Sequence, residues 1–264
     1  PVQLNLPRNI LSETAKFNFK KSKKSYETIN TTKGGKGAIE KAAKIISSAI
    51  KPVIIVGGGI KYTGNYKEVA KLAELINIPI VTAAGHGDAI PFDHKLNVGQ
   101  MGPRGNPVAS RLMKEADVII AFGTRLGFNS TFFSYENLNK KAKIIQIELE
   151  NKMLGRYFPI SVGICADAST VAKQLLNKIK INKLDKEINN WTKKYLNERS
   201  NYLQERDKVI DRFPIQPANL FKQLRSVLPK NSAITLDAGT LCLQATDALE
   251  YYDPPSLFTP LDFG

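Results

Sequence analysis

The sequence predicts an α/β protein with a Rossmann-like parallel sheet that carries helices on both faces, followed by the start of a second α/β domain. Three observations predict this class. The stretch Lys51–Ile60 contains an apolar, β-branched run that ends in three glycines, which is typical of a buried parallel strand and a tight turn. Strand and helix patterns then alternate along the chain from residue 38 to residue 179. Glycine clusters follow three of the expected strands, at the ends where parallel sheets bind ligands.

The elements of this first sheet follow from the spacing of apolar residues. In order, we expect a helix over 38–50, a strand over 52–56, a helix over 66–76, a strand over 78–82, a helix over 108–115, a strand over 117–122, a strand over 143–148 and a helix from Asp167 to Ile179. The glycine-rich residues between the second strand and the third helix are expected to form one long loop.

The second α/β domain is expected to begin after residue 180. A polar helix carries Trp191 at helical spacing, which indicates a packing anchor. The next helix starts at Gln216-Pro217-Ala218 and is expected to carry Phe221, Leu224 and Leu228 inward. A short strand over 233–236 then leads into the turn Asp237-Ala238-Gly239-Thr240.

The first residues of the chain have a different character. Residues 1–8 alternate like a strand bounded by prolines, and residues 12–37 are polar and rich in lysine, as interdomain linkers are. We therefore expect the end of a preceding domain and then a linker.

Composition restricts the function classes. The chain has 264 residues, 42% of them hydrophobic, with no pattern of a signal peptide or membrane span, which indicates a soluble, cytoplasmic protein. Cys165 and Cys242 lack metal-ligand spacing and are expected to be reduced thiols. The net charge of +14 is concentrated at residues 16–24 and 173–208, in expected linkers and solvated helix faces, so the charge does not favour nucleic-acid binding.

Several motifs, taken in their order, carry a family resemblance. They are Leu4-Asn5-Leu6-Pro7-Arg8, Pro52 to Gly59, Ile78 to Thr82, His86-Gly87-Asp88, Pro91 to His94, Gly123-Thr124-Arg125, Lys143 to Ile147, Lys152 to Gly155, Ser161 to Ile164 and Asp237-Ala238-Gly239. Together they resemble the thiamine-diphosphate enzymes of the acetolactate synthase group, and within that group the sulfoacetaldehyde acetyltransferases. The resemblance covers nearly the whole chain and is more specific for the group than for the substrate.

The resemblance implies a division into domains. Residues 1–12 would be the tail of an aminopyrimidine-binding domain, 13–36 a linker, 37–180 a DHS-like central domain, and 181–264 the truncated opening of a diphosphate-binding domain. The glutamate that activates the cofactor and the Gly-Asp-Gly motif that holds the metal would lie outside this sequence, which contains no Gly-Asp-Gly. The resemblance therefore implies that these residues alone are inactive, with no catalytic or metal-binding residue among them.

The resemblance also implies a function for the full-length protein. It would be a transferase or lyase that uses thiamine diphosphate and Mg²⁺ to make or break a C–C bond next to a carbonyl. Its substrate would be a 2-oxoacid or a sulfonated aldehyde, and its assembly a homodimer or homotetramer. An acetolactate synthase that joins two 2-oxoacids is the alternative within the group. A nucleotide-binding or nucleic-acid-binding module without catalysis is the alternative of another class.

Three sets of candidate site residues follow. By resemblance, Gly239, Thr240 and Leu241 form the turn that meets the diphosphate of the cofactor, although Leu241 departs from the polar pair of acetolactate synthases. The resemblance also implies a candidate flavin or adenine-nucleotide site, because positions that line such a site in some relatives match Gly57, Gly58, Gly59, Gly123, Thr124, Arg125 and Glu148. Here the strict dinucleotide fingerprint fails, because Tyr62 stands where its third glycine belongs, so inherited turns without a ligand remain the other interpretation. His86 and Asp88 would form an active-site loop, whereas His94 is expected to pack a loop.

Overall fold

The computed structural model describes residues 5–16, 18, 32–62, 66–102, 105–179, 186–208, 213–237 and 239–259. The chain divides into two compact units, residues 1–30 and 31–264. In the first unit, α1 (Arg8–Leu11) begins after Pro7, whose carbonyl accepts from the N–H groups of Ile10 and Leu11. The strand predicted over residues 1–8 is therefore wrong at Arg8, where the helical turn begins after an extended Pro7. Residues 5–7 belong to no helix or strand, and residues 1–4 lie outside the described part.

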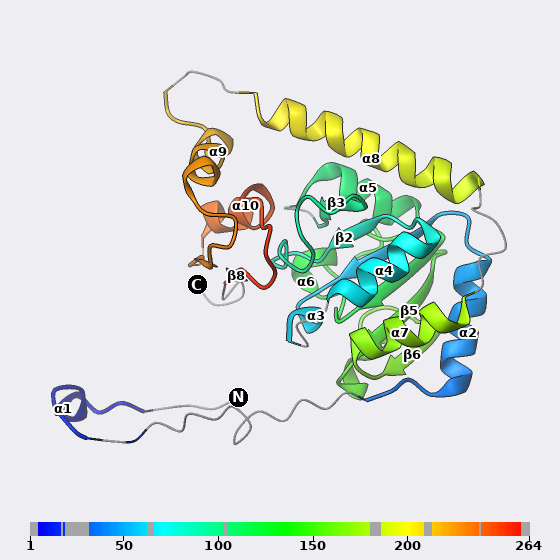
Figure 1. Ribbon diagram of the computed structural model, residues 1–264, viewed down its shortest axis with the longest axis horizontal. Helices are drawn as coiled ribbons and strands as arrows, with labels where there is room; N and C mark the ends of the chain where they lie inside the picture. Colours follow the sequence, from blue (N-terminus) through cyan, green and yellow to red (C-terminus); the bar gives the residue numbers. More distant parts are fainter. Residues whose placement is uncertain are drawn as a thin grey trace. The chain divides into compact units, whose positions relative to one another are not determined.

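The second unit is built on a six-stranded, fully parallel sheet in the order β3-β2-β1-β4-β5-β6 (Figure 1). Its strands are β1 (Pro52–Val56), β2 (Ile80–Thr82), β3 (Asn97–Gln100), β4 (Val118–Phe122), β5 (Lys143–Glu148) and β6 (Val162–Cys165). The order reverses between β1 and β4. The predicted fold class is confirmed, and the reversal is the place where open parallel sheets bind ligands.

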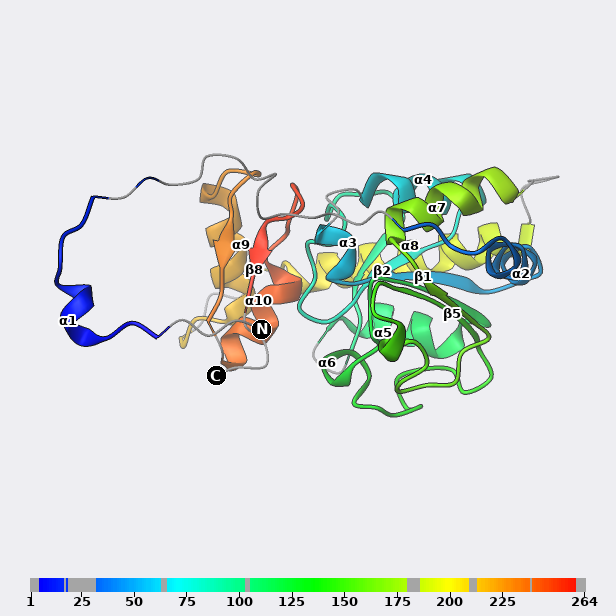
Figure 2. The same ribbon diagram turned by 90° about the horizontal axis from the view of Figure 1, so that it is seen from below.

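Helices cover both faces of this sheet. The alternate side chains Ile54 and Val56 of β1 face a core shared with α2 (Lys36–Ser47), α4 (Tyr66–Ile76) and α7 (Ala168–Lys178). Val53 and Ile55 face the opposite core, which includes α5 (Pro107–Glu115) and α8 (Lys186–Arg206). Figure 2 shows α4 and α7 on one side of the sheet and α5 on the other. Both faces are buried, as the continuous apolar runs of β1 and β4 predict.

Two strands were missing from the sequence prediction. The structure places β3 inside the stretch predicted as one long loop, where it pairs with β2, and it adds β6 at the other edge. Residues 97–100 contain two amides and a glycine, so no apolar run marks them as a strand. β6 is buried at only alternate positions, which suits an edge strand and leaves a weak pattern in the sequence.

Helix ends and packing anchors follow the expected chemistry. Asp167 caps α7 by accepting from the N–H of Thr170 at 2.8 Å. Trp191 on α8 is 6% exposed and its indole N–H donates to the carbonyl of Pro52 at 2.9 Å, which confirms it as a packing anchor.

Both cysteines are free thiols as predicted, although Cys165 is exposed. In the described part of the chain, no helix is both long and apolar enough to cross a bilayer.

The remaining elements form a smaller core. They are α9 (Pro217–Val227), β7 (Ile234–Thr235), α10 (Thr240–Ala248) and β8 (Leu257–Phe258), with β7 and β8 paired in parallel. Phe221 is buried in this core, but Leu224 is 37% exposed and Leu228 is only partly covered. The prediction that all three point inward is thus wrong for the two leucines, because two short strands offer α9 only a narrow apolar surface.

Candidate functional site

A crevice of about 550 Å³ opens at the carboxyl ends of β1, β4 and β5. Its volume lies within the roughly 300–1,000 Å³ typical of small-molecule sites. The lining comes from the turns after these strands and after β2, and from α6 (Phe128–Thr131): Gly58, Gly59, Ala83, Ala84, His86, Gly123, Thr124, Arg125, Gly127, Phe128, Asn129, Ser130, Glu148, Leu149 and Glu150. The two glycine turns singled out in the sequence therefore converge on one crevice at the point where the strand order reverses.

The glycines of these turns serve the contact between the turns themselves. A Cβ on Gly57 would lie 2.6 Å from the carbonyl oxygen of Gly123, and a Cβ on Gly59 would lie 2.7 Å from the Cα of Gly123. Gly123 has φ +58°, a left-handed conformation that favours glycine. A Cβ on Gly58 would meet the His86 ring at 2.7 Å. The close approach of the β1 and β4 turns is therefore sufficient to explain three of the four glycines without a ligand.

The charged groups of the crevice are Arg125, Glu148 and Glu150. Glu148 ends β5, is 9% exposed, and accepts from the N–H of Leu149 at 2.9 Å. Arg125 is half exposed and pairs with Glu150 at 3.1 Å, so its carboxylate partner is Glu150 and not the Glu148 considered from the sequence. The buried Thr124 accepts from the N–H of Leu126 through its hydroxyl at 3.3 Å. The Glu148 carboxylate and the Arg125 guanidinium thus line the same crevice. A carboxylate there can accept from a ribose hydroxyl, and a guanidinium can donate to a phosphate.

One aromatic ring, Phe128, lines the crevice, and the sequence prediction did not include it among the site residues. Phe128 is 54% exposed and lies 4.8 Å from the Phe132 ring, centroid to centroid, in a stacked arrangement. Phe133 joins this group and lies 4.5 Å from the Tyr157 ring. The signal in the sequence was three phenylalanines within six residues of the turn after β4. An exposed ring at a crevice offers a planar ligand a surface to stack on.

The structure gives His86 and Asp88 different surroundings. His86 lines the crevice and packs against Gly58. The Asp88 carboxylate is fully buried, and its two oxygens accept from the Lys61 amine at 2.7 Å and from the N–H groups of Ser256 and Leu257 at 2.9 Å each. Asp88 is thereby bound to the smaller core that holds β8.

The other histidine, His94, pairs with Glu74 through Nε2 at 3.1 Å and accepts from the N–H of Leu96 through Nδ1 at 3.3 Å. Its predicted role in packing a loop is confirmed.

The candidate diphosphate turn lies at the start of α10. Gly239 has φ +147°, and the space where its Cβ would stand is open. Thr240 and Leu241 follow as exposed residues of the first helical turn, so backbone N–H groups are presented to solvent. Among the residues that the structure describes, no three acidic, histidine or cysteine side chains come together as metal ligands.

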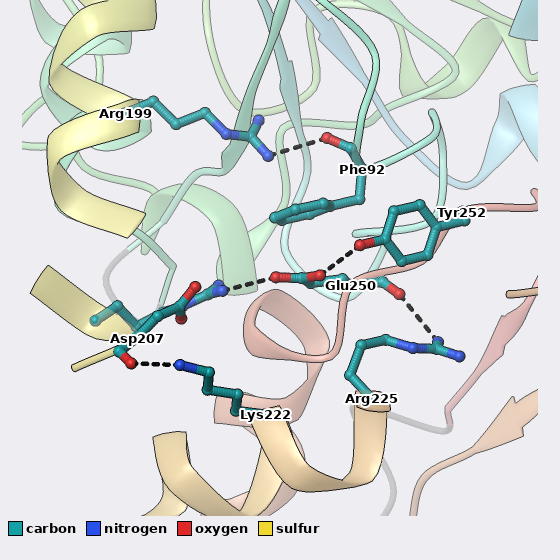
Figure 3. A network of polar contacts seen from close by, with 8 residues as sticks. Phe92, Arg199, Asp207, Lys222, Arg225, Glu250 and Tyr252 are labelled. Atoms are coloured by element: carbon teal, nitrogen blue, oxygen red, sulfur yellow. Dashed lines mark hydrogen bonds and ion pairs between the residues drawn. The ribbon is translucent and has the colours of Figure 1, made fainter. Parts of the chain in front are cut away.

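A polar network joins α8 to the smaller core (Figure 3). Arg199 is 6% exposed, and its guanidinium donates to the carbonyl oxygens of Asn97 and Phe92. Burial lowers the pKa of Arg199 to about 10, so it stays charged at neutral pH. Arg206 pairs with Glu250 at 2.9 Å, and the Tyr252 hydroxyl donates to the same carboxylate.

The comparisons with known proteins give a consistent result. Residues 39–175 match the family model described as thiamine pyrophosphate enzyme, central domain. Similar curated relatives are a sulfoacetaldehyde acetyltransferase of Castellaniella defragrans, 28% identical, and a probable one of Rhizobium meliloti, 30% identical, both matched by 100% of this chain. A probable acetolactate synthase large subunit of Methanococcus aeolicus is 30% identical over 90% of this chain. The chain covers 47%, 48% and 42% of these proteins, so it spans about half the length of the curated relatives it matches.

Proposed function

We infer the function of this chain from the family to which it belongs, the thiamine pyrophosphate enzymes, whose central domain matches its residues 39–175. We propose that it is part of an enzyme that makes or breaks a C–C bond next to a carbonyl with thiamine diphosphate, the same cofactor under its other name. The observation that carries this proposal is the family match over a six-stranded sheet of the expected class. Relatives named as acetyltransferase and synthase support an enzyme over a nucleic-acid-binding module.

The residues at the start of α10 fit the diphosphate end of this cofactor. Gly239 leaves open space before the helix, and the first-turn N–H groups of a helix suit a phosphate. Gly239, Thr240 and Leu241 would hold the diphosphate through backbone N–H groups, and the Thr240 hydroxyl could add a donor, whereas the Leu241 side chain has none. When bound, the cofactor supplies the electron sink that stabilises a carbanion next to a carbonyl. We place the ligands of Mg²⁺ outside the described residues.

For the substrate we propose a sulfonated aldehyde of the sulfoacetaldehyde kind, because sulfoacetaldehyde acetyltransferases match the whole chain. Acetolactate synthase activity on two 2-oxoacids is the second candidate, favoured by the match to an acetolactate synthase subunit. The test is the full natural polypeptide that carries this sequence, assayed with thiamine diphosphate and Mg²⁺ for consumption of sulfoacetaldehyde and of pyruvate. Sulfoacetaldehyde consumption supports the first, pyruvate consumption alone supports the second, and neither reaction contradicts both. We expect the 264-residue polypeptide alone to show no turnover.

The crevice at the β1 and β4 turns is proposed as a second binding site, for a flavin or an adenine nucleotide. Its volume, its exposed Phe128 ring, the Arg125 guanidinium and the separate Glu148 carboxylate support this, although the glycines there are explained by the packing of the turns. A bound phosphate would compete with Glu150 for Arg125, in a charge-assisted contact typically worth about 1.5–3 kcal/mol.

Calorimetric titration with flavin and adenine nucleotides tests this site. Arg125→Ala is expected to weaken binding by about tenfold or more. Lys152→Ala is the matched control, because Lys152 also pairs with Glu150, at 3.4 Å, but does not line the crevice. No heat change for any nucleotide would leave these turns as inherited scaffold.

Assembly and location complete the proposal. We propose a homodimer or homotetramer in the cytoplasm, as the family resemblance implies. Sedimentation of the full natural polypeptide checks the assembly, and a monomer across the accessible concentration range would contradict it.

A further inference from the structure

The six-stranded sheet with the loops and helices that connect its strands is called the central sheet region below. Within it, the buried carboxylate of Asp88 binds the backbone of a strand in the smaller core. Asp88 lies in the loop between β2 and β3, and its side chain is fully buried. One oxygen accepts from Lys61, and the other accepts from the consecutive N–H groups of Ser256 and Leu257 at 2.9 Å. These partners are 27, 168 and 169 residues distant along the chain. One side chain thus ties together three separate segments.

Lys61 completes this arrangement from a third direction. It belongs to α3 (Gly59–Tyr62), directly after the first glycine turn, and its amine also donates to the carbonyl of Leu257 at 3.1 Å. Its side chain is 16% exposed. The start of β8 thus makes three hydrogen bonds to these two side chains. The N–H groups of Ser256 and Leu257 donate to Asp88, and the carbonyl of Leu257 accepts from Lys61. Charge-assisted bonds of this kind are the strong ones in a dry site.

The residues on both sides of the Gly239 turn contact β8 or the residue just after it. β7 pairs with β8 in parallel, and the N–H of Leu236, three residues before Gly239, donates to the carbonyl of Phe258 at 2.9 Å. The Cys242 thiol in the first turn of α10 lies 3.4 Å from the Thr259 hydroxyl just after β8. A shift of β8 would therefore move both flanks of this turn.

The far end of α10 is also held by the central sheet region. Gln100 donates to the Thr246 hydroxyl at 3.1 Å through its side chain and to Asp247 at 3.2 Å through its backbone N–H. A Cβ on Gly87 would lie 2.2 Å from the Thr246 carbonyl, so this loop approaches α10 as closely as glycine permits. With α10 fixed at this end, the position of its first turn depends on β7 and β8.

We propose that Asp88 is a positioning residue: with Lys61 it forms a latch on β8 that sets the place of the Gly239 turn relative to the central sheet. The use of this turn by a diphosphate rests on the proposed function, whereas the latch does not. A competing explanation is that Asp88 only adds to global stability, as any buried ion pair would. The two explanations differ in which part of the chain responds when the carboxylate is lost.

Amide hydrogen exchange of this chain separates them. Asp88→Asn keeps the shape of the side chain but removes its charge and one acceptor. We expect exchange to become about tenfold or more faster at β7, β8 and the first turn of α10, with β1 and β4 unchanged. The matched control is Asp117→Asn, because Asp117 accepts from the consecutive N–H groups of Ile50 and Lys51 at 2.8 and 2.9 Å, wholly within the central region. Asp117→Asn should leave the exchange rates of β7 and β8 unchanged. Lys61→Met tests the latch with a smaller expected effect if Asp88→Asn does not fold.

The second measurement is the Kd of thiamine diphosphate in the full natural polypeptide that carries this sequence. Asp88→Asn should raise it about tenfold, and Asp117→Asn should not, even where the two variants are equally destabilised. Unchanged exchange at β7 and β8, or equal acceleration in all strands, would overturn the latch. Faster exchange at β7 and β8 with an unchanged Kd of thiamine diphosphate would contradict the claim that Asp88 positions the Gly239 turn. If the unsubstituted polypeptide binds no thiamine diphosphate, the proposed function fails, and exchange alone still decides the latch.

Discussion

The backbone N–H of Gly59 donates to the carbonyl oxygen of Gly123 at 2.9 Å, so the turns after β1 and β4 touch without any side chain between them. This contact determines the shape of the crevice, because both turns line it. The glycines after β1 are thus required for the packing of these two turns, whether or not the crevice binds a ligand. A binding role for the crevice depends on Arg125, Glu148 and Phe128.

Gly59→Ala should therefore destabilise the chain before it affects any ligand. Its Cβ would stand 2.7 Å from the Cα of Gly123, which is backbone that cannot rotate away, and overpacking of this kind costs about 1–3 kcal/mol. Gly127→Ala is the control, since Gly127 lines the same crevice with no atom within 4 Å of its Cβ position. Urea unfolding followed by circular dichroism measures both variants. Equal stability of the two would show that the turns can separate freely.

Glu250→Gln should weaken the smaller core by breaking its pair with Arg206. The side chains are 11% and 20% exposed, so the remaining guanidinium is poorly solvated and the cost should be about 1–3 kcal/mol. Glu40→Gln breaks the Lys178 pair, whose side chains are 46% and 48% exposed, and should cost about 0–1 kcal/mol. Thermal unfolding of both variants makes the comparison. Similar costs would mean that Arg206 is satisfied by Asp207 alone.

The strands that could be predicted are those with a continuous apolar run. β1 and β4 are buried at every position and appear in the sequence as PVIIV and VIIAF. β3 could not be predicted, because it is held by partners far away in sequence: Asn97 accepts from Arg199 through its carbonyl, and Gln100 contacts Thr246. A polar strand of this kind is specified by tertiary contacts and not by local propensity.

The candidate site divides in the same way. The convergence of the Gly57–Gly59 and Gly123–Arg125 turns could be predicted, because parallel strands gather their carboxyl ends at one edge. The partners of Asp88 could not, since Ser256 is 168 residues away and offers a backbone N–H that no sequence pattern marks. The spacing of His86 and Asp88 suggested a shared site, but the turn between them sends one to the crevice and the other to β8.

The stability of the chain should fall as the pH drops below about 6.5 because of His94. Burial lowers the pKa of His94 below its ordinary value of 6.5 and outweighs the nearby Glu74 carboxylate, which raises it; Asp93 raises it and Lys95 lowers it to a smaller extent. A group whose pKa is depressed in the folded state contributes stability above its unfolded pKa, and this is lost as the pH falls through its folded pKa. Protonation at Nδ1 would also oppose the N–H of Leu96. Urea unfolding at pH 7.5 and 5.5 should show a smaller loss for His94→Gln than for the unsubstituted chain, and an equal loss would assign the effect to other groups.

Trp191→Phe should destabilise the central sheet region by about 1–3 kcal/mol, because it leaves the buried Pro52 carbonyl without the indole N–H that now donates to it at 2.9 Å. Pro52 begins β1, the strand at the centre of both cores, so the loss acts on the sheet itself. The ring would still pack edge-on against Tyr195, which lies 4.7 Å away, so most of the apolar burial is kept and the hydrogen bond is the main difference. Trp191 is the one tryptophan of the sequence, and circular dichroism must therefore replace fluorescence in measuring the variant. Tyr157→Phe, at an exposed ring, is the control and should change stability by less than about 0.5 kcal/mol. A Trp191→Phe chain as stable as the control would mean that the Pro52 carbonyl finds another donor, and that α8 is held by apolar packing alone.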